Sequence, residues 1–396
     1  MSPDLLLYFE AHPAHFVQHE GKMNMFSFLP LTACARKLFA MTPRQAVCMS
    51  VMTVAVMASS HPAHAANKSK LSTYQSGKPV VGLPCEQLPT RTAVLMGGGA
   101  DVKQAFSWMI EKINQCGASK LGNFVVIRVR GNPAYDSFIN KQGALASVQT
   151  LVIPTRETAD DPELDSYIQN AAAIWITGGD QGDYYATWKG TRLERLVHEQ
   201  VKQHGIPIGG TSAGMMILSE FNYLASPNSV TSAEALADPY KTDAMTLAKD
   251  FWTDSDPINE PSPFPLLNAT VTDSHFDTRD RMGRLTAFLG RVIADGWAAP
   301  GDARAVGVDQ ETALLLEYNE SKTQLPVMPV ILSNPGVNGS AYILGAGKAS
   351  VLNIAPSQFT FTNIQVTKLS AGRTFNYLLH VNDGVMTSEN NGGSLY

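Results

Sequence analysis

The chain has 396 residues, of which 44% are hydrophobic and 16% are charged, and its formal net charge is −5 at pH 7. This composition is that of an ordinary globular protein with ample material for a large core. The negative net charge, without a basic stripe along the chain, argues against a nucleic-acid-binding protein.

The first 65 residues are predicted to be a targeting segment. Three basic residues precede the apolar run 46–58, which is too short to span a bilayer comfortably, and an A-x-A cleavage signal ends at Ala65. We therefore expect a secretory signal peptide cleaved after Ala65, with a short N-terminal membrane anchor as the alternative. Met25 and Met41 are alternative start sites. Export would place the mature protein in the periplasm or outside the cell, free of the membrane.

Export also bears on the cysteines. Cys34 and Cys48 would leave with the signal peptide, so that Cys85 and Cys116 remain in the mature chain. An exported protein with two cysteines can hold one disulfide bond. Their spacing alone does not show whether these two residues come within bridging distance.

Residues 66–84 are polar and aperiodic and are predicted to be an exposed leader, whereas 85–396 are predicted to be one domain. Apolar runs alternate with helical periodicity, which predicts βαβ units and a mostly parallel central sheet flanked by helices. The first strands are expected over 92–96, 123–128, 147–153, 171–177 and 206–209, with helices over 102–113 and 192–204. A loop region over 225–265 precedes a strand over 266–272, a helix over 279–295 and strands over 305–308, 313–317, 340–344 and 365–369.

The stretch 206–216 carries a G-x-S-x-G pattern with Ser212 at its centre, between an expected strand and an expected helix. Small residues suit such a turn, because a strained backbone and close helix packing leave no room for large side chains. The N–H groups at the start of the helix are placed to bind an oxyanion. On these five residues alone, a nucleophile and an incidental serine in a tight turn are equally good interpretations.

A nucleophilic serine needs a base, usually histidine, and a group that orients the base. His275 follows an expected strand at its C-terminal end, which is the edge where open α/β sheets bind ligands, and Ser212 is expected at the same edge. This placement favours a catalytic histidine over a structural one. His198 and His204 lie on the helix before the serine's strand and are expected at the surface.

Three arginines, Arg279, Arg281 and Arg284, begin the helix after His275. Guanidinium groups pair bidentately with carboxylates, so that the cluster suits an anionic substrate. Local pairing with Asp277 and Asp280 on a solvated face is an equally good interpretation. The fourth expected strand also ends at this edge, in a Gly-Gly-Asp-Gln segment that includes Gln181, although such Gly-Gly-Asp turns are widespread.

Four segments, taken together, are specific enough to indicate a protein family. They are Gly178-Gly-Asp-Gln181, Gly210-Thr-Ser-Ala-Gly214, Asp273-Ser-His-Phe276 with its three arginines, and Gly307-Val-Asp-Gln-Glu-Thr-Ala313. In their order and spacing, the chain resembles the cyanophycinases, a branch of the dipeptidase E-like (S51) serine peptidases. The resemblance runs from about Thr92 to at least Ala349 and is closest to exported members. It implies a single α/β domain of the class I glutamine amidotransferase-like type, with a nucleophile elbow and extra β-strands at its C-terminal end.

The resemblance also implies an activity. Cyanophycinases hydrolyse cyanophycin, a polymer with an aspartate backbone and arginine joined to each β-carboxyl, to β-Asp-Arg dipeptides. Ser212 would be the nucleophile and His275 the general base of an acyl-enzyme mechanism. The family's third catalytic member is a glutamate, for which Glu234 fits best and Glu220 is the weaker candidate. Ser274 departs from the glutamine that the family often carries there.

The family's substrate pocket maps onto Gln181, Asp273, Arg279, Arg281 and Arg284. We expect backbone N–H groups, those of Ala213 and of the Gly179 loop, to hold the oxyanion. The resemblance implies no metal and no organic cofactor. Cyanophycin or short isoaspartyl peptides are the expected binding partners, and a homodimer is compatible with the sequence.

Three other functions remain as alternatives. An isoaspartyl or aspartyl dipeptidase of the same family would act on short peptides. An α/β-hydrolase esterase would match the serine pattern, but its histidine typically lies near the chain end, unlike His275. A non-catalytic exported binding protein would keep the fold and lose turnover.

Overall fold

The computed structural model describes residues 70–115, 120–249, 251–252, 267–318, 329–355 and 358–390. All of these residues belong to one structural unit. The predicted targeting segment 1–65 and Cys116 lie outside the described residues.

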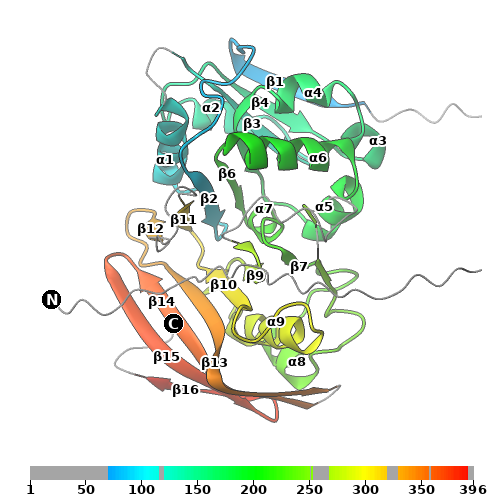
Figure 1. Ribbon diagram of the computed structural model, residues 1–396, viewed down its shortest axis with the longest axis vertical. Coiled ribbons are helices and arrows are strands. Elements are labelled where there is room, and N and C mark those ends of the chain that lie inside the picture. The colour runs from blue at the N-terminus through cyan, green and yellow to red at the C-terminus, as the bar shows by residue number, and fades with distance from the viewer. Residues whose placement is uncertain are drawn as a thin grey trace, which may run out of the picture. The chain divides into compact units, whose positions relative to one another are not determined.

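A first sheet of eight strands has a parallel centre, and its order is β1-β4-β3-β5-β6-β2-β11-β12 (Figure 1). The contacts among β2 to β6 are parallel, whereas β1, β11 and β12 join the edges antiparallel. The strands are β1 (Ser72–Gly77), β2 (Arg91–Met96), β3 (Asn123–Arg128), β4 (Ser147–Val152), β5 (Ala171–Ile176), β6 (Ile208–Thr211), β11 (Thr312–Tyr318) and β12 (Val330–Ser333). The expected mixed α/β architecture is confirmed, and β1 forms within the stretch expected to be a polar leader.

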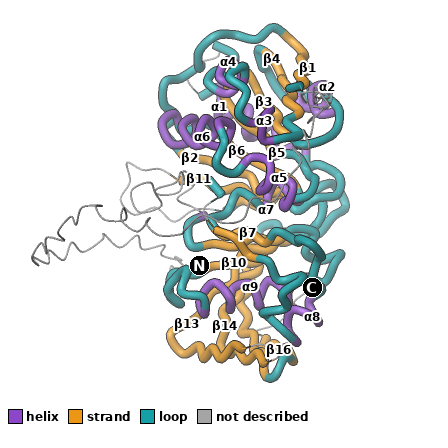
Figure 2. The backbone as a smooth tube through the Cα atoms, turned by 90° about the vertical axis from the view of Figure 1, so that its right-hand side faces the viewer, coloured by secondary structure: helices purple, strands orange, loops and turns teal. Residues whose placement is uncertain are grey.

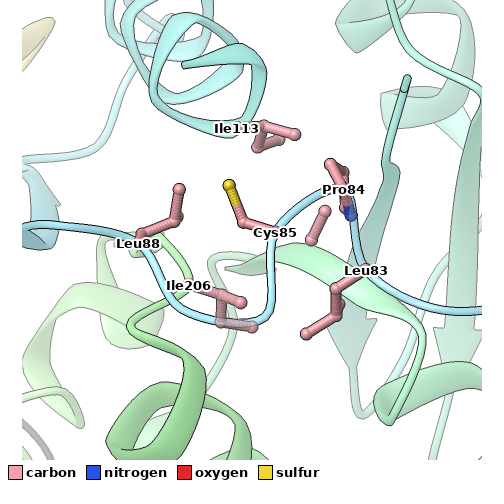
Figure 3. A pocket seen from close by; sticks show the side chains of 7 residues that line it. Leu83, Pro84, Cys85, Leu88, Ile113 and Ile206 are labelled. Carbon is pink, nitrogen blue, oxygen red and sulfur yellow. The ribbon is translucent and has the colours of Figure 1, made fainter. Parts of the chain in front are cut away.

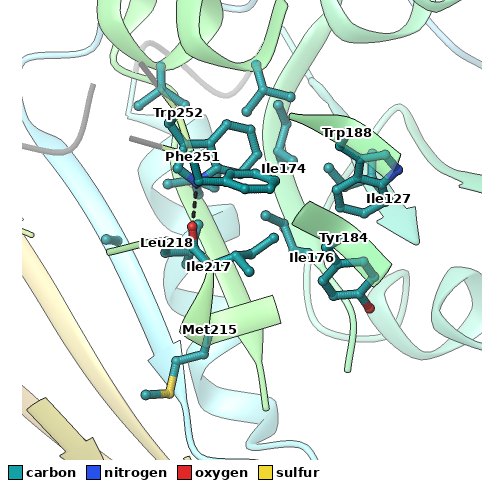
Figure 4. Packing of buried hydrophobic residues seen from close by; sticks show 14 of the residues in the cluster. Ile127, Ile174, Ile176, Tyr184, Trp188, Met215, Ile217, Leu218, Phe251 and Trp252 are labelled. Carbon is teal, nitrogen blue, oxygen red and sulfur yellow. Dashed lines mark hydrogen bonds between the residues drawn. The ribbon is translucent and has the colours of Figure 1, made fainter. Parts of the chain in front are cut away.

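Helices cover both faces of this sheet, which explains why its central strands are apolar throughout. Val94 and Met96 pack with α1 (Lys103–Asn114), whereas Ala93 and Leu95, one residue out of phase, belong to the cluster on the other face. Figure 4 shows part of that second cluster, where the indole Nε1 of Trp252 donates to the Ile217 carbonyl at 2.6 Å. The remaining helices of this half are α2 (Ala134–Ile139), α3 (Arg156–Ala159), α4 (Leu164–Ile168), α5 (Gln181–Trp188) and α6 (Arg192–Glu199).

The helix expected over 192–204 is present as α6 and a π-helical turn, Gln200–His204, that continues it. Gly205 ends the turn with a left-handed φ of 67°, as helix C-terminal glycines do. The expectation for His198 was wrong: it is buried on the packed face of α6.

A second sheet of eight strands is mostly antiparallel, with the order β16-β15-β14-β13-β10-β9-β7-β8. Only β7, β9 and β10 are parallel to one another. Its strands are β7 (Phe221–Tyr223), β8 (Leu247–Lys249), β9 (Thr270–Asp273), β10 (Arg304–Val308), β13 (Ser340–Ala355), β14 (Gln358–Ser370), β15 (Arg373–Asn382) and β16 (Val385–Asn390). Apolar side chains of α9 (Met282–Ala294) and α8 (Ser232–Ala237) pack against it. Both α8 and β8 lie within the region 225–265 that was expected to be loop.

The two sheets meet where their parallel strands end. The chain passes from β6 through the short helix α7 (Ala213–Met216) to β7, and from β10 through 309–311 to β11. Figures 1 and 2 show α7 and β7 at this junction, between the two sets of strands. The carboxyl ends of β2, β6, β9 and β10 therefore lie at one place, which is where α/β sheets bind ligands.

A small apolar cavity lies away from this junction (Figure 3). It is lined by Leu83, Pro84, Cys85, Leu88, Ile113, Ala172 and Ile206. Cys85 is disulfide-bonded. Among the described residues, no helix is long and apolar enough to cross a membrane.

Candidate active site

Ser212 sits on the sharp turn between β6 and α7. Its φ of 53° and ψ of −120° lie in a region that non-glycine residues rarely adopt, at a cost of about 1–3 kcal/mol. The turn is tight because Gly210 and Gly214 approach closely: a Cβ on Gly210 would lie 2.4 Å from the backbone carbon of Gly214. The Ser212 N–H donates to the Met96 carbonyl at 3.0 Å, which ties the turn to the end of β2.

His275 lies across the junction from this serine. Its Nε2 is 2.8 Å from the Ser212 Oγ, which is hydrogen-bonding distance. The His275 N–H donates to the Gly97 carbonyl at 2.7 Å, so the loop after β2 holds both the serine and the histidine. The structure therefore brings together the two residues that the sequence predicts as nucleophile and base, although they come from different sheets.

The His275 imidazole rests against Gly98, in the three-glycine loop that follows β2. A Cβ on Gly98 would lie 2.4 Å from Cε1 and 2.5 Å from Nε2 of the ring, so no side chain fits between loop and ring. Gly98 also has a φ of +96°, which glycine adopts at little cost. The close packing of this loop against the ring therefore fixes the plane of the imidazole.

Gln310 contacts the other ring nitrogen of His275. Its Nε2 lies 2.5 Å from Nδ1, and it reaches the ring from the connection between β10 and β11. The Gln310 N–H donates to Oδ1 of Asp277 at 2.9 Å. Ser212, His275 and Gln310 therefore form a continuous hydrogen-bonded row. The sequence analysis did not select Gln310 as a site residue.

Burial, followed by the positive charges of Arg279 and Arg281, lowers the pKa of His275 to about 4, although the charges of Asp273 and Asp277 oppose this shift. The ring is therefore neutral at ordinary pH, as a residue that accepts a proton from a serine must be. Among the described residues, no group of three or more His, Cys, Asp and Glu side chains is arranged to hold a metal ion.

Comparisons with known proteins show which families the chain is similar to. Residues 134–250, which include Ser212, match the model of peptidase family S51. The cyanophycinase of Nostoc sp. strain PCC 7120 is 23% identical over 280 residues, covering 69% of this chain and 77% of that protein. The cyanophycinase of Geminocystis herdmanii is 22% identical over 236 residues, covering 58% of this chain and 76% of the relative.

By sequence, this chain is similar to the peptidases of family S51 and to the cyanophycinases. A solved structure of a peptidase from an acI-B1 Actinobacterium is also similar, at 19% identity and a TM-score of 0.42, covering 73% of this chain and 98% of that one. The S51 match ends at residue 250, before His275.

The S51 resemblance implied a glutamate beside the histidine, and the structure corrects both candidates. Glu234 begins α8, where one carboxylate oxygen accepts from Thr231 and the other pairs with Lys241 at 2.8 Å. Glu220 accepts from the Ala269 N–H at 2.6 Å, at the start of β9, whereas His275 follows the end of that strand. Neither glutamate occupies the place beside Nδ1.

Three residues expected to line the S51 substrate pocket are bound to one another. Asp273 is fully buried, and its carboxylate accepts from Arg281 at 3.0 Å and from Arg284 at 2.7 Å. Arg281 also donates to the Ser274 carbonyl at 2.6 Å, and Arg284 to the Val230 carbonyl at 3.1 Å. The network anchors the segment that carries His275, so these side chains support the base instead of presenting an open surface.

The other two expected pocket residues differ, because Arg279 is exposed whereas Gln181 is buried. Arg279 is exposed, and its guanidinium has no ion-pair partner among the residues that the structure describes. Gln181 begins α5, and its neighbour Asp180 caps that helix by accepting from the Gly182 N–H at 2.8 Å. Gly178 faces the serine, since its Cβ would lie 3.5 Å from the Ser212 Cβ. The segment 178–181 therefore borders the Ser212 turn.

Proposed function

We propose that this chain is a serine peptidase that hydrolyses cyanophycin to β-Asp-Arg dipeptides through an acyl-enzyme, with Ser212 as nucleophile and His275 as general base. The observation that carries the proposal is the 2.8 Å contact between Ser212 Oγ and His275 Nε2. The strained backbone of Ser212 supports it, because a nucleophile elbow exposes its serine on a strand-to-helix turn of this kind.

The chemistry follows from that contact. As Ser212 Oγ attacks the scissile carbonyl carbon, its proton passes to His275 Nε2, and the carbonyl oxygen becomes an oxyanion. When the C–N bond breaks, His275 returns that proton to the leaving nitrogen, which leaves an ester on Ser212. Water then attacks the ester, again losing a proton to His275, and the serine is regenerated with release of the acid.

Backbone N–H groups would hold the oxyanion. Ala213 is the first residue of α7, and the first N–H groups of a helix have no partner within it. Gly179 follows Gly178, which faces Ser212. We assign the oxyanion hole to these two amides, as expected for a class I glutamine amidotransferase-like fold. Donors at such positions typically contribute a 10²–10³-fold rate increase.

Cyanophycin is the preferred substrate because several relatives at about this level of similarity are cyanophycinases. Each arginine joined to its backbone keeps a free α-carboxylate, which suits the exposed guanidinium of Arg279 beside the site. Gln181 would contact the substrate from the segment that borders Ser212. We further propose that residues 1–65 direct export, which the N-terminus of the mature protein, read by mass spectrometry, would test.

A second candidate is an isoaspartyl dipeptidase of the same family, and one observation favours it. Asp273 neutralises Arg281 and Arg284 inside the protein, so only Arg279 of the arginine cluster is exposed. A single exposed guanidinium suits one terminal carboxylate at least as well as a polymer of carboxylates.

The deciding experiment offers purified cyanophycin and short isoaspartyl dipeptides to the full-length protein and identifies soluble products by mass spectrometry. Wild type should release β-Asp-Arg, and Ser212→Ala should release at least about 10⁴-fold less while still binding the polymer. Ser107→Ala, an exposed serine on α1, is the matched control and should behave as wild type. Cleavage of dipeptides but not of cyanophycin would assign the second function.

A further inference from the structure

The place beside Nδ1 of His275 is occupied by a neutral side chain. Gln310 contacts Nδ1 at 2.5 Å, while Glu234 and Glu220 are both bound elsewhere. Serine hydrolases usually place a carboxylate here, which accepts a hydrogen bond from Nδ1–H and stabilises the imidazolium. The oxygen of a carboxamide can accept the same hydrogen bond but carries no charge.

The structure holds Gln310 firmly against the ring. Its backbone N–H is fixed to Asp277, and the next residue, Glu311, donates its own N–H to the Gly98 carbonyl at 2.8 Å. A Cβ on Gly99 would lie 3.6 Å from both Cβ and Cδ of Gln310, so the same glycine loop borders the histidine and the glutamine. Three segments therefore converge at the contact between Gln310 and His275, namely the glycine loop after β2, the segment after β9 and the β10–β11 connection.

The orientation of the carboxamide decides what the Ser212–His275 pair can do. If the amide nitrogen of Gln310 donates to Nδ1, the neutral ring carries its proton on Nε2 and has no lone pair for the serine proton. If the amide oxygen accepts from Nδ1–H, Nε2 is free to act as base. The two ends of a carboxamide have nearly the same shape, so the contact fits either arrangement.

We propose that Gln310 is the positioning residue of this Ser–His pair, and that its carboxamide oxygen holds His275 in the tautomer that accepts the proton of Ser212. This inference rests on the proposed function, since it assigns a role within the same site. An amide in this position is compatible with catalysis, because papain-like proteases use an asparagine.

A neutral residue beside Nδ1 affects the pH range in which His275 can act as a base. Without a carboxylate at Nδ1, burial and then the nearby positive charges lower the pKa of His275, so that the neutral ring remains available as a base in the acidic range. The charged or titratable groups around the ring come from the segment after β9 and from the β10–β11 connection, namely Asp273, Asp277, Arg279, Arg281, Asp309 and Glu311. The glycine loop and the Ser212 turn contribute no charged side chain within 97–99 and 210–214.

The test measures the rate at which a fluorophosphonate probe labels Ser212 in the full-length protein, as a function of pH. This readout does not depend on the natural substrate. Gln310→Met, which keeps the size but cannot accept the Nδ1 proton, should lower the limiting rate about 100-fold or more. Gln310→Glu should label at least as fast as wild type at pH 7, and its acid limb should move up by about 1 to 3 pH units because a carboxylate favours the imidazolium.

Gln365→Glu is the matched control, because it makes the same substitution on an exposed position of β14. It should leave the acid limb unmoved, and melting curves should show that each variant is folded. A Gln310→Met variant that labels within threefold of wild type, or a Gln310→Glu variant whose acid limb does not move, would overturn the proposal.

The tautomer of His275 gives an independent readout by ¹⁵N NMR of histidine-labelled protein. The proposal expects the proton on Nδ1 in wild type at neutral pH, and a proton on Nε2 would contradict it even if the probe failed to react. Failure of the proposed function looks different. If Ser212 labels with the expected dependence on Gln310 but cyanophycin is not cleaved, the substrate assignment fails and the role of Gln310 stands.

Discussion

The two sides of the site are built in different ways. Ser212 is positioned by its own neighbourhood, a strained turn between β6 and α7 whose glycines lie within two residues of it. His275 is positioned by distant segments, with Gly98 against its face, Gln310 at Nδ1 and the Asp273 network beneath its loop. A nucleophile can thus be placed by local backbone geometry, whereas its base depends on tertiary structure.

If this comparison is right, damage to the support of His275 should impair activity while the Ser212 turn stays intact. The largest effect on stability is expected for Asp273→Asn. This change removes the charge that neutralises two buried guanidinium groups, Arg281 and Arg284. Breaking a buried ion network in this way typically costs about 3–5 kcal/mol. Urea unfolding should show the loss, whereas Asp302→Asn at an exposed position should not change stability beyond about 0.5 kcal/mol.

Gly98→Ala should affect activity more than stability. The added methyl group would overlap the His275 ring, which must then move away from Ser212. Misplacing a catalytic group by about 1 Å can cost about 100-fold in rate, and we expect a loss of that size in kcat/KM. Gly296→Ala is the matched control, because Gly296 also has a positive φ but a Cβ there meets nothing within 4 Å. Equal losses in both variants would show that backbone strain, and not the ring contact, is responsible.

The pH profile should report the environment of His275. The neutral ring is the active form, and its pKa is lowered to about 4 by burial and then by the neighbouring arginines. The kcat/KM of the free enzyme should therefore hold as pH falls from 7 to 5 and decline through about pH 4. An acid limb near 6.5, the ordinary histidine value, would mean that the ring is more solvated than the structure shows.

Glu234→Gln should have the smallest effect. The carboxylate caps α8 and pairs with Lys241, and the Lys241 contact, followed by Thr231, lowers its pKa to about 2. Its contribution to stability is complete above the unfolded pKa, near 4.5, and is lost as pH falls through about 2. Because the pair is exposed, the change in melting temperature should be small and should shrink with added salt. A loss of kcat/KM greater than twofold would show that Glu234 does contribute to the active site.

The contrast between local positioning of Ser212 and tertiary positioning of His275 also explains which parts of the site could be predicted from the sequence. Apolar strand patterns such as 123–128 match the structure to the residue. Ser212 and His275 were expected at one edge of a single sheet, and they do meet, but they follow strands of two sheets whose ends lie together. Gln310 was missed because the resemblance implies a glutamate as the third catalytic residue. A signal existed, since Gln310 follows the expected strand 305–308, whose end lies beside the end of β9.

The arginines show a second limit. Arg279, Arg281 and Arg284 are alike in sequence, but only Arg279 is exposed, whereas the other two are bound to Asp273. Burial depends on how α9 packs against the second sheet, which local spacing does not reveal. The strand β16, which pairs with β15, was also not predicted, because most of its residues are exposed and its pattern is weakly apolar.

The central claim is that Ser212 forms a covalent acyl-enzyme with its substrate. The most direct measurement mixes the full-length protein with cyanophycin, quenches the reaction in acid within one turnover, and maps substrate-derived adducts by peptide mass spectrometry. The account predicts an aspartyl ester on the peptide that contains Ser212, absent from Ser212→Ala. Release of β-Asp-Arg by wild type and Ser212→Ala at the same rate, with no adduct on that peptide, would contradict it.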